Sequence, residues 1–263
     1  TGVAAVFPFL GGVTTDLVGW RWNFAYYGMA LLVAAVVVRF LDDPWVGRWV
    51  PVGRQFRLAI AEVATPVNAV TMALGALTFF VMFGLFLTLI PIHLDLVFDL
   101  NPTKRGLVAA IPALTSTATA LTVSWFRARL SVGFLVATGL GVFGAAFVAM
   151  GLGSLWLLVV AAAVYGLAEG LMVPTLQDLV AERAPEDLRG VLMALWVGGL
   201  RIGQTTGPLF VGAAIGLWST GTVLVLSGAT TGFLAIAVAV AGILPSGRPV
   251  ELEEPGSSAH ANG

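Results

Sequence analysis

Two ionisable side chains lie deep inside long apolar stretches, where an isolated charge is costly. Glu169 belongs to the stretch 155–177, and Arg201 belongs to the stretch 190–216. At 1.5 Å per helical residue, Glu169 would lie about 12 Å and Arg201 about 17 Å from the loop between the two stretches. An unpaired charge at this depth in a bilayer costs at least about 2.5 kcal/mol, so we expect the two to pair. Glu169, alone or paired, is a candidate to bind a substrate or a proton; the alternative is an ion pair that only fixes helix packing.

The stretch 190–216 has two different faces if it is helical. Gln204 shares the face of Arg201, whereas Gly199, Gly203 and Gly207 recur every four residues on the opposite face. Small residues allow two membrane helices to approach closely. We therefore expect the glycine face to contact a neighbouring helix, and Arg201 with Gln204 to face a polar interior.

Further charged residues lie near the ends of apolar stretches. Asp178 and Arg189 bound the loop 178–189, while Arg127 and Arg129 follow the stretch 105–126. These four residues are candidates for a gate at one membrane face. The alternative is that they are simply solvated, because charges at helix ends need no function.

The composition restricts the class of protein. Of all residues, 58% are hydrophobic and 10% are charged, and the mean hydropathy is +0.96. Ordinary soluble domains contain about 25% charged residues. A soluble globular fold is therefore excluded, and the lipid bilayer is the expected partner.

Enzymatic chemistry has little support in the sequence. The chain has no Cys, and its two His residues, His93 and His260, lie at the rim of a stretch and in the C-terminal tail. This leaves no buried cluster for a metal ion. The single Lys, Lys104, follows no glycine-rich run and cannot form a phosphate-binding loop. We expect no enzyme, no cofactor, no metal and no nucleic-acid partner.

The apolar stretches are long enough to be membrane-spanning helices, which need roughly 20 residues. Charges and turn signals bound seven complete candidates, and residues 1–15 resemble the end of an eighth. Because the chain begins without Met, we interpret it as truncated at its N-terminus. The sequence thus predicts an all-α membrane protein, with spans at 22–40, 67–91, 105–126, 132–151, 155–177, 190–216 and 220–244.

Basic residues predict the orientation. If 41–66 is cytoplasmic, nine basic residues lie inside and three, Arg21, Lys104 and Arg105, lie outside. The segment 41–66 mixes charges with aromatic residues and predicts a short amphipathic segment on the inner membrane face. The polar tail 245–263 is expected to be disordered and cytoplasmic.

A short internal similarity suggests a repeat. Residues 7–12 pair with residues 207–212 at an offset of 200, so that Pro8 corresponds to Pro208 and Gly12 to Gly212. Gly207 completes the second copy. Such a repeat indicates a six-helix bundle that occurs twice in the whole protein.

Two six-helix repeats joined by a long cytoplasmic linker are the plan of the major facilitator superfamily, which this sequence resembles over nearly its whole length. Pro8, Gly11 and Gly12 resemble the Gly-Pro-x-x-Gly-Gly signature of the antiporter branch, with Phe7 in place of the first Gly. The resemblance implies that 1–40 is the end of the N-terminal bundle, with part of helix five and helix six. It also implies that 41–66 is the linker and 67–244 the C-terminal six-helix bundle.

The resemblance also implies a function. It predicts a plasma-membrane transporter, monomeric when full length, that exports small organic compounds in exchange for protons by alternating access. A uniporter or symporter of a small polar solute is the main alternative. A channel or a receptor that does not transport is a further one, because either can be a helical bundle without catalytic motifs.

Overall fold

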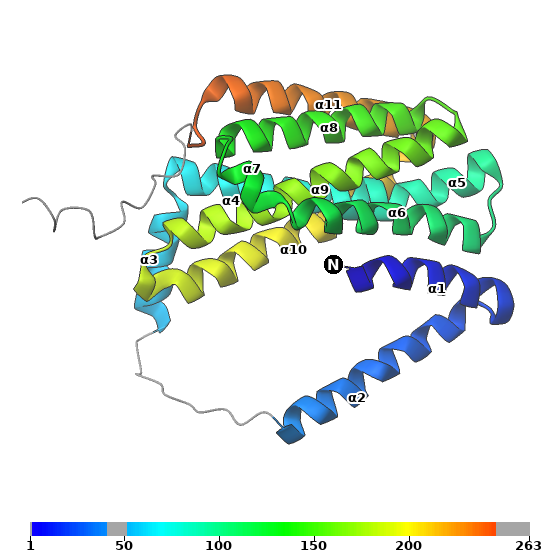
Figure 1. Cartoon of the computed structure of the whole chain (residues 1–263), viewed down its shortest axis with the longest axis horizontal. Helices are drawn as coiled ribbons and strands as arrows, with labels where there is room; N and C mark the ends of the chain where they lie inside the picture. The colour runs from blue at the N-terminus through cyan, green and yellow to red at the C-terminus, as the bar shows by residue number, and fades with distance from the viewer. Residues whose placement is uncertain (1, 41–51, 246–263) are drawn as a thin grey trace, which may run out of the picture.

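The computed structural model describes residues 2–40 and 52–245, and these residues form helices and turns without a strand (Figure 1). Helices α4, η2 and α5 are continuous and form one span from Pro66 to Phe98. The elements in chain order are α1 (Gly2–Val18), η1 (Trp20–Phe24), α2 (Ala25–Phe40), α3 (Val52–Val63), α4 (Pro66–Phe80), η2 (Val81–Leu89), α5 (Ile90–Phe98), α6 (Pro102–Ala120), α7 (Val123–Arg127), α8 (Val132–Gly151), α9 (Leu155–Arg183), η3 (Glu186–Leu188), α10 (Arg189–Ala214) and α11 (Thr220–Ala241).

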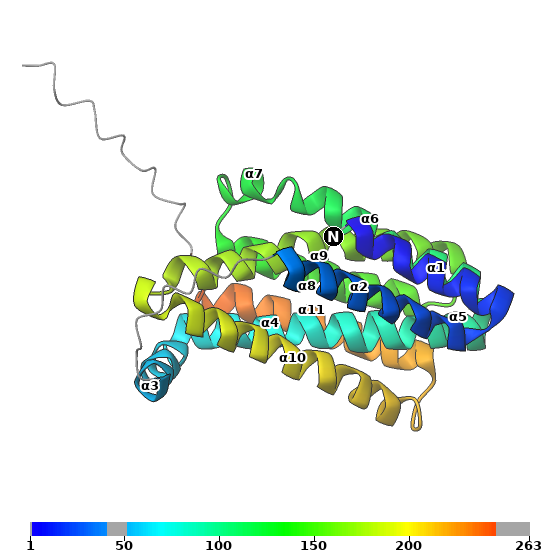
Figure 2. The same ribbon diagram turned by 90° about the horizontal axis from the view of Figure 1, so that it is seen from below.

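Helices α4 to α11 form one bundle. Helix α8 packs against α9 and α11, α6 packs against α9, and α10 packs along α4 and η2. Helix α1 lies along α6 in both views (Figure 1, Figure 2), whereas α2 turns away from the bundle, as Figure 1 shows. The largest buried side chains include Tyr165, Phe143 and Phe147 at the centre of the core. The predicted all-α fold is confirmed.

Five of the described helical segments are long and apolar enough to cross a membrane. Helices α6 and α10 are not among them, because they contain more polar residues. In α6 the hydroxyls of Thr115, Thr117 and Thr119 donate to carbonyls one turn earlier, which satisfies them in apolar surroundings. Seven complete spans are compatible with this bundle, and the exact number stays a prediction. The five helical segments that are long and apolar enough to cross a membrane are Trp20–Phe40, Pro66–Phe98, Val132–Gly151, Leu155–Arg183 and Thr220–Ala241.

Side-chain caps fix where several helices begin. The hydroxyls of Ser131, Ser154 and Ser219 accept hydrogen bonds from backbone N–H groups three residues later. Such caps satisfy an amide that has no partner within the helix. The predicted starts at 132, 155 and 220 are confirmed. Asn101 caps α6 in the same way, so that helix begins at Pro102 and not at 105.

Several predicted helix ends were wrong. The stretch 67–91 continues to Phe98, and Pro91 lies inside this continuous span, directly after the π-helical segment η2. That helix ends at Asp99, whose φ of 50° is left-handed. The stretch 155–177 continues to Arg183, and the stretch 105–126 is broken after Ala120 before the short helix α7.

The predicted linker 41–66 contains the amphipathic helix α3. Its Ala59 is buried against Ala184, Leu188 and Leu192, whereas the neighbouring Phe56 is exposed. The amphipathic segment expected here is thus helical. Residues 41–51 and the tail 246–263 lie outside the described residues, and the predicted domain bounds stay predictions.

Candidate functional site

A pocket of about 530 Å³ lies where α1, η2, α6 and α9 meet. Glu169 is the one charged residue among the residues described in its lining, and Ser116 is the other polar one. The remaining lining is apolar and comes from Phe7, Pro8, Met82, Phe86, Leu87, Ala109, Pro112 and Ala113. The pocket thus offers a single carboxyl group in a hydrophobic cavity, an arrangement suited to a ligand with a cationic and an apolar part.

An aromatic cluster supports the wall behind Glu169. Tyr165 is fully buried one turn before Glu169 on the same face of α9. Its ring stacks on Phe86 at a centroid distance of 4.7 Å and on Phe143 at 4.8 Å. Its hydroxyl interacts with the carboxyl group of Glu169, although the geometry of the two groups falls short of a regular hydrogen bond. The cluster fixes the position of α9 and keeps the Tyr165 hydroxyl close to the Glu169 carboxyl.

The opposite wall is formed by a wide helical segment. In η2 the backbone follows a π-helix, and the N–H of Ile90 donates to the carbonyl of Leu85, five residues earlier. Met82, Phe86 and Leu87 of this segment line the pocket. Wide helical turns of this kind occur often at functional sites, because they shift side chains relative to a regular helix. Here the widening includes the part of the helix that faces Glu169.

The expected ion pair between Glu169 and Arg201 is not present, and that prediction was wrong for this conformation. Arg201 is exposed, and its Nη1 donates to Oε1 of Gln204 at 2.5 Å. Gln204 and Arg201 therefore do share a face, as expected. Neither residue is part of the lining of the Glu169 pocket.

Close packing on the other face of α10 explains the position of Arg201. A Cβ on Gly203 would collide with the carbonyl of Ala76, and one on Gly207 would meet the carbonyl of Phe80. These two glycines make the close helix contact predicted for them. Gly199 does not, because a Cβ there would have open space around it. The contact holds this face against α4 and η2 and turns Arg201 outward.

The residues of the predicted antiporter signature lie at the contact between α1 and α6. A Cβ on Gly12 would collide with the carbonyl of Pro102, and a Cβ on Gly106 would collide with the carbonyl of Pro8. The two helices therefore touch through their backbones at two reciprocal points. The carbonyl of Gly11 accepts the hydroxyl of Thr15 at 2.7 Å. Within the described residues, Pro8 also lines the Glu169 pocket.

The second copy of the pattern makes different contacts. Gly207 packs against Gly84 of η2, whereas a Cβ on Gly212 would meet nothing within 4 Å. Pro208 is partly buried between them. The similarity in sequence therefore does not extend to a shared packing role, and the repeat itself stays a prediction.

Two of the four gate candidates are brought together at the end of the bundle that carries α3 and α7. Arg127 donates from Nη1 to Asp178 at 2.8 Å and from Nη2 to Glu182 at 2.9 Å. Arg129 stacks on Trp125 in the same region, with its guanidinium 4.1 Å from the ring centroid. Arg189 is exposed at the start of α10 and joins none of these ion pairs.

Sequence reasoning did not find the partners of three residues that organise these regions. Glu182 follows Asp178 by four residues, so its place beside Arg127 follows from helical spacing once the helix is known to continue. Asp16 bonds to the first turn of α6 through the amide of Thr103, at 2.8 Å. His93, expected at the rim, is buried, and its Nδ1 lies 2.7 Å from the hydroxyl of Thr220. No spacing rule links residues so far apart in the chain.

The long apolar helices and their packing define this chain as an α-helical membrane protein. Residues 72–261 match the family model described as Major Facilitator Superfamily, so the chain belongs to that superfamily of transporters. The resemblance to this superfamily, inferred from the sequence, is confirmed. It is a family of carriers and not of enzymes.

A solved structure supports the same fold. The chain is similar to a bacterial homologue of the iron transporter ferroportin in an inward-facing state, with a TM-score of 0.60 and 15% identity. The similarity covers 90% of this chain and 59% of that one. This chain thus spans about three fifths of the length of that transporter. No match was found among curated proteins.

Proposed function

We propose that this chain is part of a secondary active transporter that exports amphipathic organic cations in exchange for protons. The observation that carries the proposal is the position of Glu169, a single carboxyl group in an otherwise largely apolar pocket of about 530 Å³. A carboxyl group in apolar surroundings is retained mainly where it binds a charge or a proton. Glu169 serves both ligands in turn, because a proton and a cation compete for the same oxygen atoms.

The pocket lining favours a ligand that is partly apolar. Phe86 presents an aromatic side chain beside the carboxyl group, and Met82 supplies an adaptable apolar surface. A small polar solute would need several hydrogen-bonding partners, whereas Ser116 and Glu169 are the polar residues described in this lining. This contrast favours an amphipathic cation over a polar solute as the substrate of the proposed exporter.

The contact between α1 and α6 couples the position of α1 to the shape of the pocket. Pro8 of α1 borders the pocket, and its carbonyl also touches Gly106 of α6. Motion of α1 along α6 would therefore change both the closure of the helix contact and the shape of the pocket. This coupling is what a carrier requires to expose one site to two sides in turn.

The test measures proton release from proteoliposomes that contain the full-length protein, after addition of tetraphenylphosphonium to one side. Wild type is expected to release protons, and Glu169→Gln is expected to fold but to lose the release. Glu186→Gln is the matched control, because Glu186 is exposed on η3 and far from the pocket lining. Full activity of Glu169→Gln would overturn the role of Glu169.

Two further measurements separate the alternatives. Counterflow of labelled substrate, stimulated by substrate on the other side, is expected of a carrier and not of a channel. Addition of Fe²⁺ tests the substrate class named for the similar ferroportin homologue. Proton release with Fe²⁺ and none with the organic cation would replace the proposed substrate by a metal ion.

A further inference from the structure

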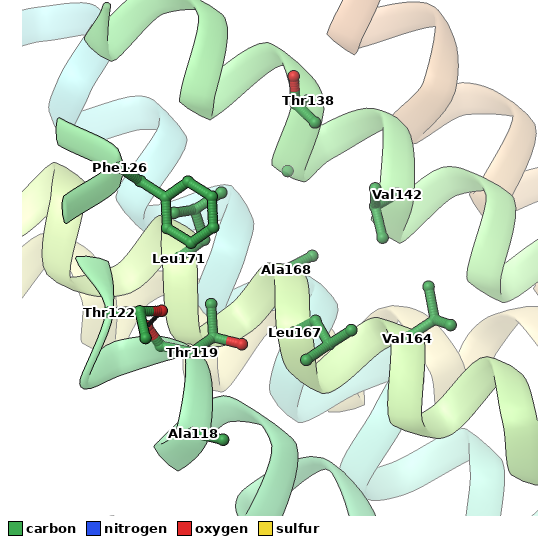
Figure 3. Close-up of a pocket in the computed structure, with 11 residues that line it drawn as sticks. Ala118, Thr119, Thr122, Phe126, Thr138, Val142, Val164, Leu167, Ala168 and Leu171 are labelled. Atoms are coloured by element: carbon green, nitrogen blue, oxygen red, sulfur yellow. Dashed lines mark hydrogen bonds between the residues drawn. The ribbon is translucent and has the colours of Figure 1, made fainter. Parts of the chain in front are cut away.

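A second cavity, separate from the Glu169 pocket, opens between α6, α8 and α9. Its volume is about 470 Å³, which lies in the range of ligand-binding pockets. Figure 3 shows α9 side chains between those of α6 and α8. Helices α6 and α8 each pack against α9 but make little contact with each other, which leaves a groove. Its lining comes from Ala118, Thr119, Thr122, Phe126, Thr138, Gly139, Val142, Val164, Leu167, Ala168 and Leu171.

The groove lies on the opposite side of α9 from the candidate substrate site. Leu167, Ala168 and Leu171 line the groove, whereas Glu169 lines the other pocket. Side chains that are 100° apart on a helix face different surroundings, so α9 separates the two cavities. Leu167 is 46% exposed, and its outward part belongs to the apolar surface that membrane lipid covers.

The walls of the groove are apolar although three threonines contribute to them. The hydroxyl of Thr119 donates to the carbonyl of Thr115 at 3.1 Å, and the hydroxyl of Thr122 donates to that of Thr119 at 2.8 Å. Both hydroxyls are thus satisfied within their own segment. Apart from the hydroxyl of Thr138, methyl, methylene and aromatic groups remain to contact a ligand, which is the surface that an acyl chain requires.

Helix α7 closes one end of the groove, and Arg129, in the turn after α7, places a cation there. Phe126 lines the groove, and its ring meets the ring of Trp125 edge-on at 5.0 Å. Trp125 in turn carries the guanidinium of Arg129 at 4.1 Å from its centroid. A continuous path of contacts therefore leads from the apolar groove to a positive charge, at the end of the bundle where interfacial Trp and Arg side chains are expected.

The two arginines of this region differ in their charge balance. Arg127 is bound by the carboxylates of Asp178 and Glu182. Arg129 is exposed, and among the described residues no carboxylate lies within 4.0 Å of it. Its charge is therefore available to an anion outside the chain. An anionic lipid headgroup is the anion that lies at this depth beside a membrane protein.

We infer that this groove binds one anionic phospholipid, with an acyl chain between α6 and α8 and the headgroup at Arg129. The apolar groove is followed by the positive charge of Arg129, just as the acyl chain of such a lipid is followed by its anionic headgroup at the membrane surface. A neutral lipid would use the groove without the charge, and a soluble phosphate would use the charge without the groove. The site therefore selects a ligand that has both an acyl chain and a negatively charged headgroup.

The test uses native mass spectrometry of the full-length protein, with phosphatidylglycerol or phosphatidylcholine of identical acyl chains as the added lipid. Wild type should retain one phosphatidylglycerol with roughly a fivefold preference, the factor expected for one basic residue at an anionic headgroup. Thr138→Phe fills the groove and should abolish retention of both lipids. Thr230→Phe, at an exposed site on α11, is the matched control and should retain the lipid.

Arg129→Gln separates the headgroup from the chain. It should remove the preference for phosphatidylglycerol while phosphatidylcholine is still retained, whereas Arg183→Gln should change neither. If Thr138→Phe does not fold, Ala118→Phe fills the same groove from α6. Equal retention of both lipids by wild type would overturn the headgroup site, and undiminished retention by the groove-filling variants would overturn the acyl-chain site. Competition by glycerol phosphate alone would point to a soluble anion and would also overturn the proposal.

Discussion

The carboxylate of Asp16, at the end of α1, accepts a hydrogen bond of 2.8 Å from the backbone N–H of Thr103 in the first turn of α6. The hydroxyl of Thr103 donates to the same oxygen atom. The N-terminus of a helix carries a partial positive charge, which a carboxylate stabilises. Asp16 of α1 thus caps α6 through Thr103, which lies 87 positions later in the chain.

We predict that Asp16→Ala weakens the contact between α1 and α6. Loss of a capping side chain costs about 1 kcal/mol, and Asp16→Asn, which keeps an acceptor, should cost less than half of that. The measurement is the thermal unfolding midpoint of the purified protein. Asp99→Asn is the control, because Asn tolerates the left-handed backbone at this position. Equal midpoints for Asp16→Ala and wild type would contradict the prediction.

A second prediction concerns the backbone contact between the same helices. Gly106→Ala and Gly12→Ala place a methyl group against the carbonyls of Pro8 and Pro102, so the helices must separate. Overpacking of this kind costs about 1–3 kcal/mol. Gly28→Ala is the matched control: a Cβ on Gly28 meets nothing within 4 Å, and Ala is the better helix former. The unfolding midpoint should fall for the first two variants and stay or rise for the control.

The helices could be predicted from the sequence better than the contacts between them. Runs of apolar residues with Ser131, Ser154 and Ser219 before them locate three helix starts, because capping depends on neighbours in the chain. The end at Asp99 could not be located in this way. The last turns before it are held in the bundle by a tertiary contact, because the buried His93 bonds to Thr220, which is 127 residues away.

The candidate site was predicted in part for the same reason. Glu169 stands out because a carboxyl group in an apolar stretch is unusual, and the structure places it in a pocket. Its supposed partner Arg201 was chosen from its depth and from its place on the next helix in sequence. Depth does not specify the rotation of a helix, and the contact of Gly203 with Ala76 turns α10 so that Arg201 faces outward.

A third prediction tests the ion pairs of Arg127, whose side chain is 15% exposed. Arg127→Gln leaves Asp178 and Glu182 one turn apart without a counter-charge, and these carboxylates are about half exposed. We expect a loss of about 1–2 kcal/mol, reduced by solvent screening from the value of a buried pair. The loss should be partly restored by adding Asp178→Asn, with a coupling energy of at least about 0.5 kcal/mol.

Chemical or thermal unfolding of the two single variants and the double variant measures this coupling. Arg183→Gln is the control, because it removes an exposed arginine of α9 that forms no ion pair with a described residue. Strictly additive effects of Arg127→Gln and Asp178→Asn would show that the pair does not stabilise the fold.

A fourth prediction separates the ring of Tyr165 from its hydroxyl. Tyr165→Ala removes a ring that stacks on Phe86 and Phe143, and loss of a buried aromatic side chain costs about 3–5 kcal/mol. Tyr165→Phe keeps the stacking and should leave the unfolding midpoint unchanged. If the hydroxyl orients the Glu169 carboxyl, Tyr165→Phe should still reduce substrate-driven proton release several-fold. Normal release by a fully folded Tyr165→Phe would restrict Tyr165 to a packing role.

The last prediction follows from the separation of Glu169 and Arg201. Because the two side chains do not pair in this conformation, Glu169→Gln and Arg201→Gln should have independent effects on stability. Independent substitutions add to within about 0.3–0.5 kcal/mol, and unfolding of the double variant measures the sum. Arg201 is exposed, and its side-chain hydrogen bond is to Gln204 on the same helix. Arg201→Gln should therefore change the free energy of unfolding little by itself. A coupling energy well above this limit would mean that the pair forms in a second conformation, which an alternating-access carrier must populate.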